Sequence, residues 1–344
     1  MDFVSILEQL IAGKSLSQEV AGEAISAVMT GELTEVQASS LLTALRCKGE
    51  TVDEIIGAAR AMRAHATKIP SRTQGVIDTC GTGGDRHGSF NISTTASFVI
   101  AAAGIPVAKH GNRSATSKCG SIDLFEYLGI NVMMTPEQMA HCLHTTGLSV
   151  LFARVVHPAM KYAAPVRTAL KFRTIFNFLG PLTNPTVPDF QLIGISDQQY
   201  LEIYASCLQQ LGVKKAWIVH GTDGMDEITL SGPTQVIEVT PDNLSTLEIH
   251  PQDVGLNIYP LDALKGGDVA VNAGITMRIL EGSEQSAPRE AVLMNAGAAI
   301  YIAGKVDTIR DGVALAEEVL SSGKARQVLE NLRTASQEEV SIGA

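Results

Sequence analysis

The chain has 344 residues, of which 45% are hydrophobic and 18% are charged, and its formal net charge is −10. This composition excludes a largely disordered chain, and the acidic balance argues against a protein that binds nucleic acid through a basic face. No apolar run reaches the roughly 20 residues of a membrane-spanning helix, and no secretory signal opens the sequence, so we expect a cytoplasmic protein with no membrane or nucleic-acid partner. The five scattered cysteines contain no CxxC pair, which argues against a disulfide framework and a structural zinc site.

Residues 1–68 show helical patterning throughout. Apolar side chains recur at helical spacing, and glycines separate the periodic segments. Ser17, Thr34 and Thr51 each stand just before a periodic segment, where an N-cap is expected. We therefore predict a small bundle of about four helices.

From residue 75 the pattern changes to short strands that alternate with helices. Such alternation indicates βαβ units and a mostly parallel sheet, and therefore an α/β fold. We predict strands over 75–80, 105–108, 130–134, 148–152 and 215–219, a hairpin-like pair near 228–230 and 235–239, and helices over 93–103, 123–128, 136–145, 289–303 and 312–333.

Residues 158–188 interrupt this alternation, because they are first helical and then rich in proline and asparagine. We interpret them as a hinge that returns to the helical domain. The predicted organisation is a small N-terminal helical bundle over 1–70, joined through 158–188 to a large α/β domain made of 71–157 and 189–344.

A glycine-rich turn follows the first predicted strand, in the sequence Asp78-Thr79-Cys80-Gly81-Thr82-Gly83-Gly84-Asp85. Such a turn can point several backbone N–H groups into one concavity that binds an anion, although many glycine clusters are only tight turns. Asp85 closes the motif, and an acid beside a bound anion requires a cation or a hydroxyl between them. Farther along, Ser93 and Thr94 open an apolar helix, either as ordinary N-caps or as part of a phosphate site at the helix N-terminus.

A charged and polar segment follows the second predicted strand, in the sequence Lys109-His110-Gly111-Asn112-Arg113-Ser114. The C-terminal edge of a parallel sheet is where α/β proteins bind ligands, and the alternative is a solvated surface turn. Small polar residues continue through 115–121, as suits a flexible lid over phosphates.

Two further features concern a metal and an acceptor. Asp226 and Glu227 are adjacent carboxylates on a loop, and Mg²⁺ prefers one or two carboxylates together with water and substrate phosphates. A solvated acidic turn is the alternative. Arg167 lies among small and apolar residues of the hinge, where it would either grip a planar carboxylate or form an interdomain salt bridge.

Together these features favour a ligand that carries a pyrophosphate and a separate monophosphate and binds with magnesium. Phosphoribosyl pyrophosphate (PRPP) fits this description. The hinge arginine would then serve an acceptor that carries a carboxylate.

The motifs closely resemble, in order and over essentially the whole chain, those of the anthranilate phosphoribosyltransferase family. The matching segments are residues 81–85, 91–94, 109–114, 173–177 and 226–227. The resemblance implies the fold of pyrimidine nucleoside phosphorylases, a homodimer that contacts through its helical domains, and Mg²⁺-dependent transfer of the phosphoribosyl group from PRPP to the amine of anthranilate in tryptophan biosynthesis.

The resemblance also implies residue roles. The residues implied to bind PRPP are Gly81, Thr82, Gly83, Gly84, Asp85, Asn91, Ser93, Thr94, Lys109, Ser117, Lys118, Cys119, Gly120 and Ser121. The residues implied to bind anthranilate are Gly81, His110, Asn112, Arg167 and Gly180. The residues implied to hold the metal are Ser93, Asp226 and Glu227, with Asp85 acting through water. The sequence departs from the family pattern at Thr116 and Cys119, where serines are expected.

The implied mechanism needs no indispensable general base, because an aromatic amine is already neutral near pH 7, and His110 is the one candidate proton acceptor.

Two other interpretations of the function remain. A pyrimidine nucleoside phosphorylase-type enzyme would need one free phosphate, and the doubled phosphate features and the Asn112–Arg167 grip oppose it. A non-catalytic, nucleic-acid-binding relative of the fold is opposed by the acidic charge and the Asp226-Glu227 pair.

Overall fold

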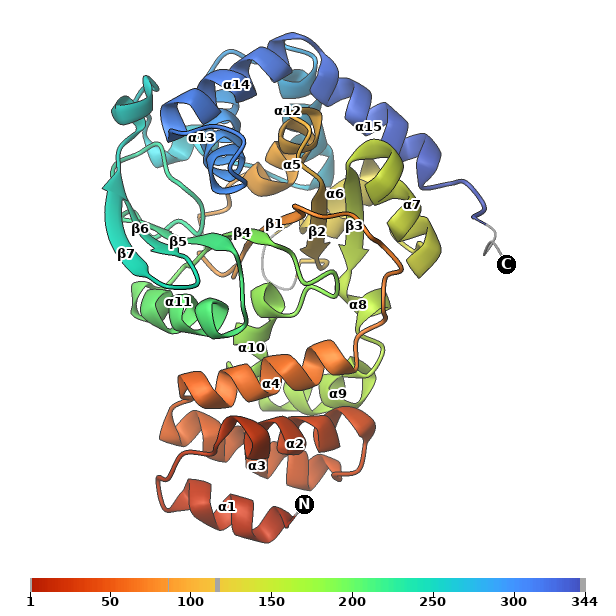
Figure 1. The fold of residues 1–344 in the computed structure, drawn as a ribbon, viewed down its shortest axis with the longest axis vertical. Coiled ribbons are helices and arrows are strands. Elements are labelled where there is room, and N and C mark those ends of the chain that lie inside the picture. The colour runs from red at the N-terminus through yellow and green to blue at the C-terminus, as the bar shows by residue number, and fades with distance from the viewer. Residues whose placement is uncertain (1, 86, 115–117, 341–344) are drawn as a thin grey trace.

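The computed structural model describes residues 2–85, 87–114 and 118–340. The N-terminal helices form a bundle at one end of the molecule (Figure 1). They are α1 (Phe3–Ile11), α2 (Gln18–Thr30), α3 (Glu35–Lys48) and α4 (Val52–Ala64). The three expected N-caps are confirmed, since the Ser17, Thr34 and Thr51 hydroxyls each accept a hydrogen bond from the backbone N–H three residues later.

Two glycines allow α2 and α4 to cross at very short range. A Cβ atom on Gly57 would lie 2.1 Å from the carbonyl oxygen of Gln18, and one on Gly22 would lie 3.2 Å from the carbonyl oxygen of Gly57. Only glycine fits at Gly57, because backbone atoms of α2 fill the space that a side chain would need.

A seven-stranded sheet forms the centre of the second part of the chain, in the order β3-β2-β1-β4-β5-β6-β7. The strands are β1 (Ile77–Gly81), β2 (Val107–Gly111), β3 (Leu148–Phe152), β4 (Phe190–Gly194), β5 (Lys215–Gly221), β6 (Thr234–Val239) and β7 (Leu244–Ile249). The first five strands in this order pair in parallel, and β6 and β7 are added antiparallel. The expected mostly parallel α/β sheet is confirmed.

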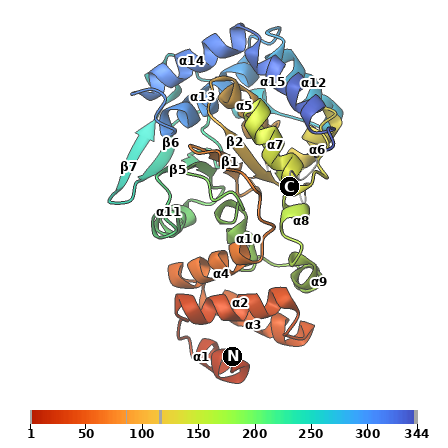
Figure 2. The ribbon, with the colours of Figure 1, turned by 45° about the vertical axis from the view of Figure 1, so that its right-hand side comes forward.

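Helices cover both faces of the sheet (Figures 1 and 2). The longer ones are α5 (Ile92–Ala102), α6 (Ser121–Tyr127), α7 (Pro136–Thr146), α11 (Leu201–Gln210), α12 (Val269–Leu280), α13 (Ala287–Ile302), α14 (Ile309–Ser321) and α15 (Lys324–Ala335). The hinge helix α9 (Met160–Leu170) packs instead against α2 and α3 of the bundle. Two four-residue helices, α8 (Ala153–Val156) and α10 (Phe176–Leu179), and short 3-10 turns complete the fold. No helix within the described ranges is long and apolar enough to cross a membrane.

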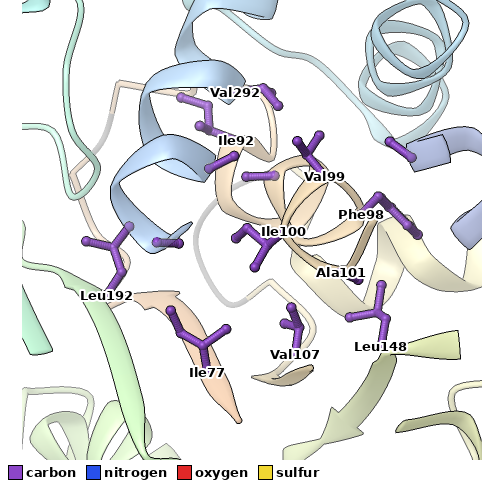
Figure 3. Close-up of a cluster of buried hydrophobic side chains, with 14 of the residues drawn as sticks. Ile77, Ile92, Phe98, Val99, Ile100, Ala101, Val107, Leu148, Leu192 and Val292 are labelled. Carbon is purple, nitrogen blue, oxygen red and sulfur yellow. The ribbon is translucent and has the colours of Figure 1, made fainter. Parts of the chain in front are cut away.

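The sheet separates two hydrophobic cores. Figure 3 shows part of one of them, where Val99 and Ile100 of α5 pack above Ile77 of β1 and Val107 of β2. The other core joins the opposite face of the sheet, through residues such as Ile193, to α11, the hinge helices and the N-terminal bundle. The hinge is therefore packed against both parts of the molecule.

Three expected elements differ from the structure, and some observed elements were not expected. Residues 130–134 form no strand, because the Asn131 N–H donates to the Ser336 hydroxyl at 3.0 Å instead of joining a ladder. Residues 228–230 form no strand either, because the side-chain amide of Asn295 binds the backbone of Ile228. Gly323, in a left-handed conformation, divides the expected helix over 312–333 into α14 and α15, and α12 was not expected.

Candidate active site

The glycine-rich turn lies at the C-terminal end of β1, beside the ends of β4 and β5. The Thr82 N–H donates to the Gly194 carbonyl at 2.9 Å, and the Gly83 N–H donates to Asp226 Oδ2 at 2.6 Å. A Cβ atom on Gly81 would lie 2.4 Å from that same carboxylate oxygen, so the close approach of the two loops requires glycine there. The sequence analysis missed Ser196, whose hydroxyl donates to the Gly83 carbonyl at 3.0 Å.

Three carboxylates gather beside this turn. Glu227 accepts a hydrogen bond from the Ser93 N–H at 3.1 Å, and Asp226 accepts the one from Gly83. Burial raises the pKa of Glu227 to about 7, against the opposing charge of Lys109. Burial, and next the charges of Asp85 and Glu227, raise the pKa of Asp226 well above its usual range.

The same carboxylates meet the requirements of a divalent cation. Asp85 Oδ2 is buried and has no hydrogen-bond partner among the described residues, and Asp85 lies close enough to Asp226 to raise the pKa of that carboxyl. A cation would also offset the mutual repulsion of Asp85, Asp226 and Glu227. In the described part of the chain no three His, Cys, Asp or Glu side chains are grouped so that they could hold a metal ion by themselves. Mg²⁺ commonly takes only one or two protein carboxylates together with water and phosphate oxygens.

The N-terminus of α5 faces these carboxylates. Asn91 occupies the N-cap position and its side chain makes no capping hydrogen bond, whereas Ser93 and Thr94 lie inside α5, so they are not the N-caps that one alternative expected. Its amide nitrogen donates to the Cys119 carbonyl at 3.2 Å, and its amide oxygen accepts from Asn272 at 2.9 Å. The sequence analysis missed Asn272, because it lies on the helix that was not expected. Thr94, one residue past Ser93, is buried in the helix.

Lys109 and His110 belong to strand β2 and not to a loop after it, which corrects the expected end of that strand. Lys109 is 2% exposed, and its ammonium group donates to the Thr79 carbonyl and, at 3.3 Å, to the Ser93 hydroxyl. Burial lowers the pKa of Lys109, and the charge of Asp78 opposes that shift. The buried ammonium thus connects β1, β2 and the start of α5.

The lid segment is fixed at both described ends. Asp123 accepts hydrogen bonds from the Ser114 N–H at 3.1 Å and from the Gly120 N–H at 2.9 Å. Arg113 pairs with Asp123 and Glu126 on the surface, and Lys118 is exposed. The other lid residues expected to bind PRPP are Cys119, Gly120 and Ser121, which are described, and Ser117, which lies outside the described residues together with Thr116. Burial raises the pKa of the Cys119 thiol to about 11, so this side chain stays protonated.

The expected acceptor residues come from β2 and the hinge. His110 Nδ1 lies 3.1 Å from the Gly180 carbonyl, and its Nε2 lies 3.2 Å from Nε2 of His157. A carbonyl oxygen only accepts, so Nδ1 of His110 carries the proton and its Nε2 accepts from His157. Burial lowers the pKa of His110 to about 4 and that of His157 to about 3, so both rings are neutral at pH 7. His157 was missed, since a single histidine in the hinge carries no motif.

Arg167 stands on α9, with its guanidinium carbon 5.6 Å from the centre of the Phe176 ring. Burial lowers the pKa of Arg167, and no carboxylate among the described residues opposes that shift, so the expected alternative of an interdomain salt bridge is absent there. The exposed Asn112 follows β2, and its carbonyl accepts from the Ser121 hydroxyl at 3.5 Å.

Comparisons with known proteins show which family the chain belongs to. Residues 73–326 match the α/β domain of a glycosyl transferase family, and residues 4–66 match the helical bundle domain of a glycosyl transferase family. The chain is 47% identical to anthranilate phosphoribosyltransferase of Rubrobacter xylanophilus over 98% of both sequences, and 49% identical to that of Symbiobacterium thermophilum over 96% of both.

Solved structures are similarly close. The anthranilate phosphoribosyltransferase of Thermus thermophilus superposes with a TM-score of 0.92 at 43% identity, covering 97% of this chain and 99% of that one. The Saccharomyces cerevisiae enzyme, in complex with PRPP and Mg, gives a TM-score of 0.89 at 25% identity, with 97% of each chain covered. The chain belongs to the anthranilate phosphoribosyltransferase family.

Proposed function

We propose that this protein transfers the phosphoribosyl group of PRPP to the amine of anthranilate, which gives N-(5-phosphoribosyl)anthranilate and pyrophosphate in tryptophan biosynthesis. One observation carries the proposal. The glycine-rich turn, the start of α5 and the Asp226-Glu227 loop are joined directly, through the Gly83–Asp226 and Ser93–Glu227 hydrogen bonds. An anion nest, a helix N-terminus and paired carboxylates therefore share one edge of the sheet, as a pyrophosphate with its metal requires.

The donor would occupy this edge. The pyrophosphate would lie against the turn and Lys109, and the 5′-phosphate would lie at the N-terminus of α5, where free N–H groups favour an anion. The residues proposed to contact PRPP are Gly81, Thr82, Gly83, Gly84, Asp85, Asn91, Ser93, Thr94, Lys109, Lys118, Cys119, Gly120 and Ser121, together with Ser117.

Asp226, Glu227 and Ser93 would hold Mg²⁺, with Asp85 acting through water. A bound Mg²⁺ neutralises charge that develops on the leaving pyrophosphate. Lys109 adds a second, fixed positive charge on the same side, and its burial makes that charge effective because water does not screen it. The chain's own contribution is thus to stabilise the leaving group before the bond breaks.

The acceptor would bind between the hinge and the end of β2. Arg167 would pair with the anthranilate carboxylate, and Asn112, His110, Gly180 and Gly81 would position the ring and the amine. Nε2 of His110 already accepts from His157, which favours a positioning role over proton transfer. Closing the hinge and the lid would exclude water, which otherwise competes as the acceptor.

We also propose a cytoplasmic homodimer that contacts through the helical domains. A hollow of about 710 Å³ lies between α1 and α3, lined by Leu7, Leu10 and Ile11. Ile11 is 73% exposed and Val36 is 76% exposed, which are large apolar surfaces for a single chain. A second copy would cover them.

The test follows the fluorescence of anthranilate in a mixture of the protein, PRPP and Mg²⁺. The signal should fall only when all three are present. Arg167→Ala should raise the KM for anthranilate at least tenfold with little change in the KM for PRPP, whereas Arg310→Ala, on the remote helix α14, should behave as the unchanged protein. An Arg167→Ala variant with normal anthranilate kinetics would overturn the proposed acceptor site.

A further inference from the structure

The backbone ladder of the sheet is interrupted between the neighbouring strands β1 and β2. β1 pairs with β4 over five residues, and β2 pairs with β3 over five. Between β1 and β2 the ladder contains one pair, Ile77 with Val107. In a regular parallel ladder the next backbone groups of both strands would continue to bond each other.

Side chains bind these backbone groups beyond that pair. The His110 N–H donates to Asp78 Oδ1 at 3.2 Å, and the Ala108 carbonyl accepts from the Asn184 amide nitrogen at 2.8 Å. The same amide nitrogen donates to Asp78 Oδ2 at 2.9 Å. The Thr79 carbonyl accepts from the Lys109 ammonium group. The two strands are therefore held apart by a linked carboxylate and amide.

The pair is fully enclosed and fully bonded. Asp78 and Asn184 are both 0% exposed. The Asn184 amide oxygen accepts from the N–H and the hydroxyl of Thr186, at 3.0 and 2.8 Å, so every hydrogen-bonding group of this side chain is used. Burial of a carboxylate costs free energy that its hydrogen bonds must offset, so its place between two strands of the sheet calls for a function.

The contacts of Lys109 indicate what that function is. Beyond the Ile77–Val107 pair, the Lys109 ammonium group donates to the Thr79 carbonyl, which a continued ladder would occupy, and also to the Ser93 hydroxyl. The backbone of the neighbouring His110 is fixed by Asp78. Asn184 comes from the hinge, which also carries Arg167 and Gly180.

We propose that Asp78 and Asn184 are positioning residues, which separate β1 from β2 so that Lys109 and His110 reach the substrates, and which fix the hinge to the sheet. The inference rests on the proposed function, since it assigns the pair to the donor and acceptor halves of that site. Neither residue touches substrate; both act through Lys109, His110 and the hinge.

The first test compares two isosteric changes. Asp78→Asn keeps the shape but replaces one of the two acceptors, which face the Asn184 amide nitrogen and the His110 N–H, with a donor. Glu54→Gln is the matched control, because Glu54 is also a 0% exposed carboxylate, bonded to Lys48 and to two backbone N–H groups, but in the helical bundle. At a temperature where both variants are folded, Asp78→Asn should lower kcat at least tenfold, and Glu54→Gln should stay within about twofold.

The second test is rescue. Asn184→Asp alone places two carboxylates against each other and should lose activity and stability. The exchange Asp78→Asn with Asn184→Asp restores one carboxylate and one amide, and it should recover at least part of the kcat lost in Asp78→Asn. If the pair only stabilised the fold, the double variant would recover the melting temperature without recovering kcat.

The outcomes separate the two proposals. If the wild-type protein does not consume anthranilate, the proposed function itself is wrong. An active unchanged protein whose Asp78→Asn variant keeps kcat within twofold, or whose Glu54→Gln variant loses as much, would overturn the positioning role.

Discussion

The Asp226 carboxylate accepts the Gly83 N–H at 2.6 Å and thereby joins two loops that are 143 residues apart in the sequence. The contact places a carboxylate directly against the glycine-rich turn that is proposed to bind the pyrophosphate. Such an arrangement is stable only while the carboxylate is hydrogen-bonded, and it becomes favourable when a cation lies between acid and anion. The Gly83–Asp226 hydrogen bond therefore holds the two loops together and also places a carboxylate where a bound cation would be favourable.

Asp226→Asn separates these two roles. The amide oxygen of asparagine still accepts from Gly83, so the loops should keep their places while the negative charge is lost. We expect kcat/KM to fall roughly 100-fold or more and the Mg²⁺ concentration for half activity to rise. Steady-state kinetics across a Mg²⁺ titration would measure both, with the surface variant Asp242→Asn as the control, and a normal titration for Asp226→Asn would contradict the metal assignment.

Gly81→Ala tests the close approach of the loops. The added Cβ would meet Asp226 Oδ2 at 2.4 Å, so the carboxylate must move. We expect a severe loss of activity with a modest loss of stability, because the site lies at the edge of the sheet. Gly232→Ala is the matched control, since its nearest neighbour would be the Thr222 hydroxyl at 3.6 Å and its backbone is unstrained. Equal activities of the two variants would show that the Gly81 contact is dispensable.

The buried carboxylates predict how stability depends on pH without metal. Burial raises the pKa of Glu227 to about 7 and that of Asp78 to about 6, so the folded protein holds these protons more tightly than the unfolded chain does. The free energy of unfolding should therefore fall as pH rises from about 4 to about 7. Glu227 alone should contribute on the order of 1 kcal/mol between pH 6 and pH 8.

Urea denaturation in EDTA at the two pH values would measure this slope. Glu227→Gln should flatten it and should be more stable than the unchanged protein at pH 8. A slope that survives Glu227→Gln in full would contradict the assignment of the titration to this residue.

Gly57→Ala tests the crossing of α2 and α4. A methyl group would lie 2.1 Å from the Gln18 carbonyl oxygen, so the helices must separate. We expect the free energy of unfolding to fall by about 2 kcal/mol or more. Urea denaturation monitored by circular dichroism would measure this loss. Gly274→Ala, in α12, would meet only the end of the Arg278 side chain at 3.7 Å and should be neutral or stabilising by up to about 1 kcal/mol. The reverse order of stabilities would contradict the packing.

Local patterns were enough to predict much of the fold. The N-caps at Ser17, Thr34 and Thr51 depend on neighbouring residues only, and strand 148–152 is a short apolar run with clear ends, which matches β3. Strand 130–134 was wrong because Ile130, Val132 and Met134 alternate as in a strand while no neighbouring strand is available to pair with them. The Asn131 N–H between them donates instead to the hydroxyl of Ser336, which lies 205 residues away in the sequence.

In the candidate site, too, features made of neighbouring residues were predicted and features that depend on distant residues were not. The glycine-rich turn and the Asp226-Glu227 pair are compact motifs, and the sequence indicates them directly. Asn184, Asn272 and His157 act through residues distant in the sequence, and nothing near them marks a function. Lys109 was expected in a loop, because a charged residue in a central strand is rare, and only the separation of β1 from β2 provides the space for it.

The central claim is tested most directly by measuring two products in one reaction of the purified protein with PRPP, Mg²⁺ and anthranilate. The account predicts that each anthranilate consumed releases one pyrophosphate and forms one molecule with the mass of N-(5-phosphoribosyl)anthranilate. Pyrophosphate release that does not depend on anthranilate, or no reaction at all with the three together, would contradict it.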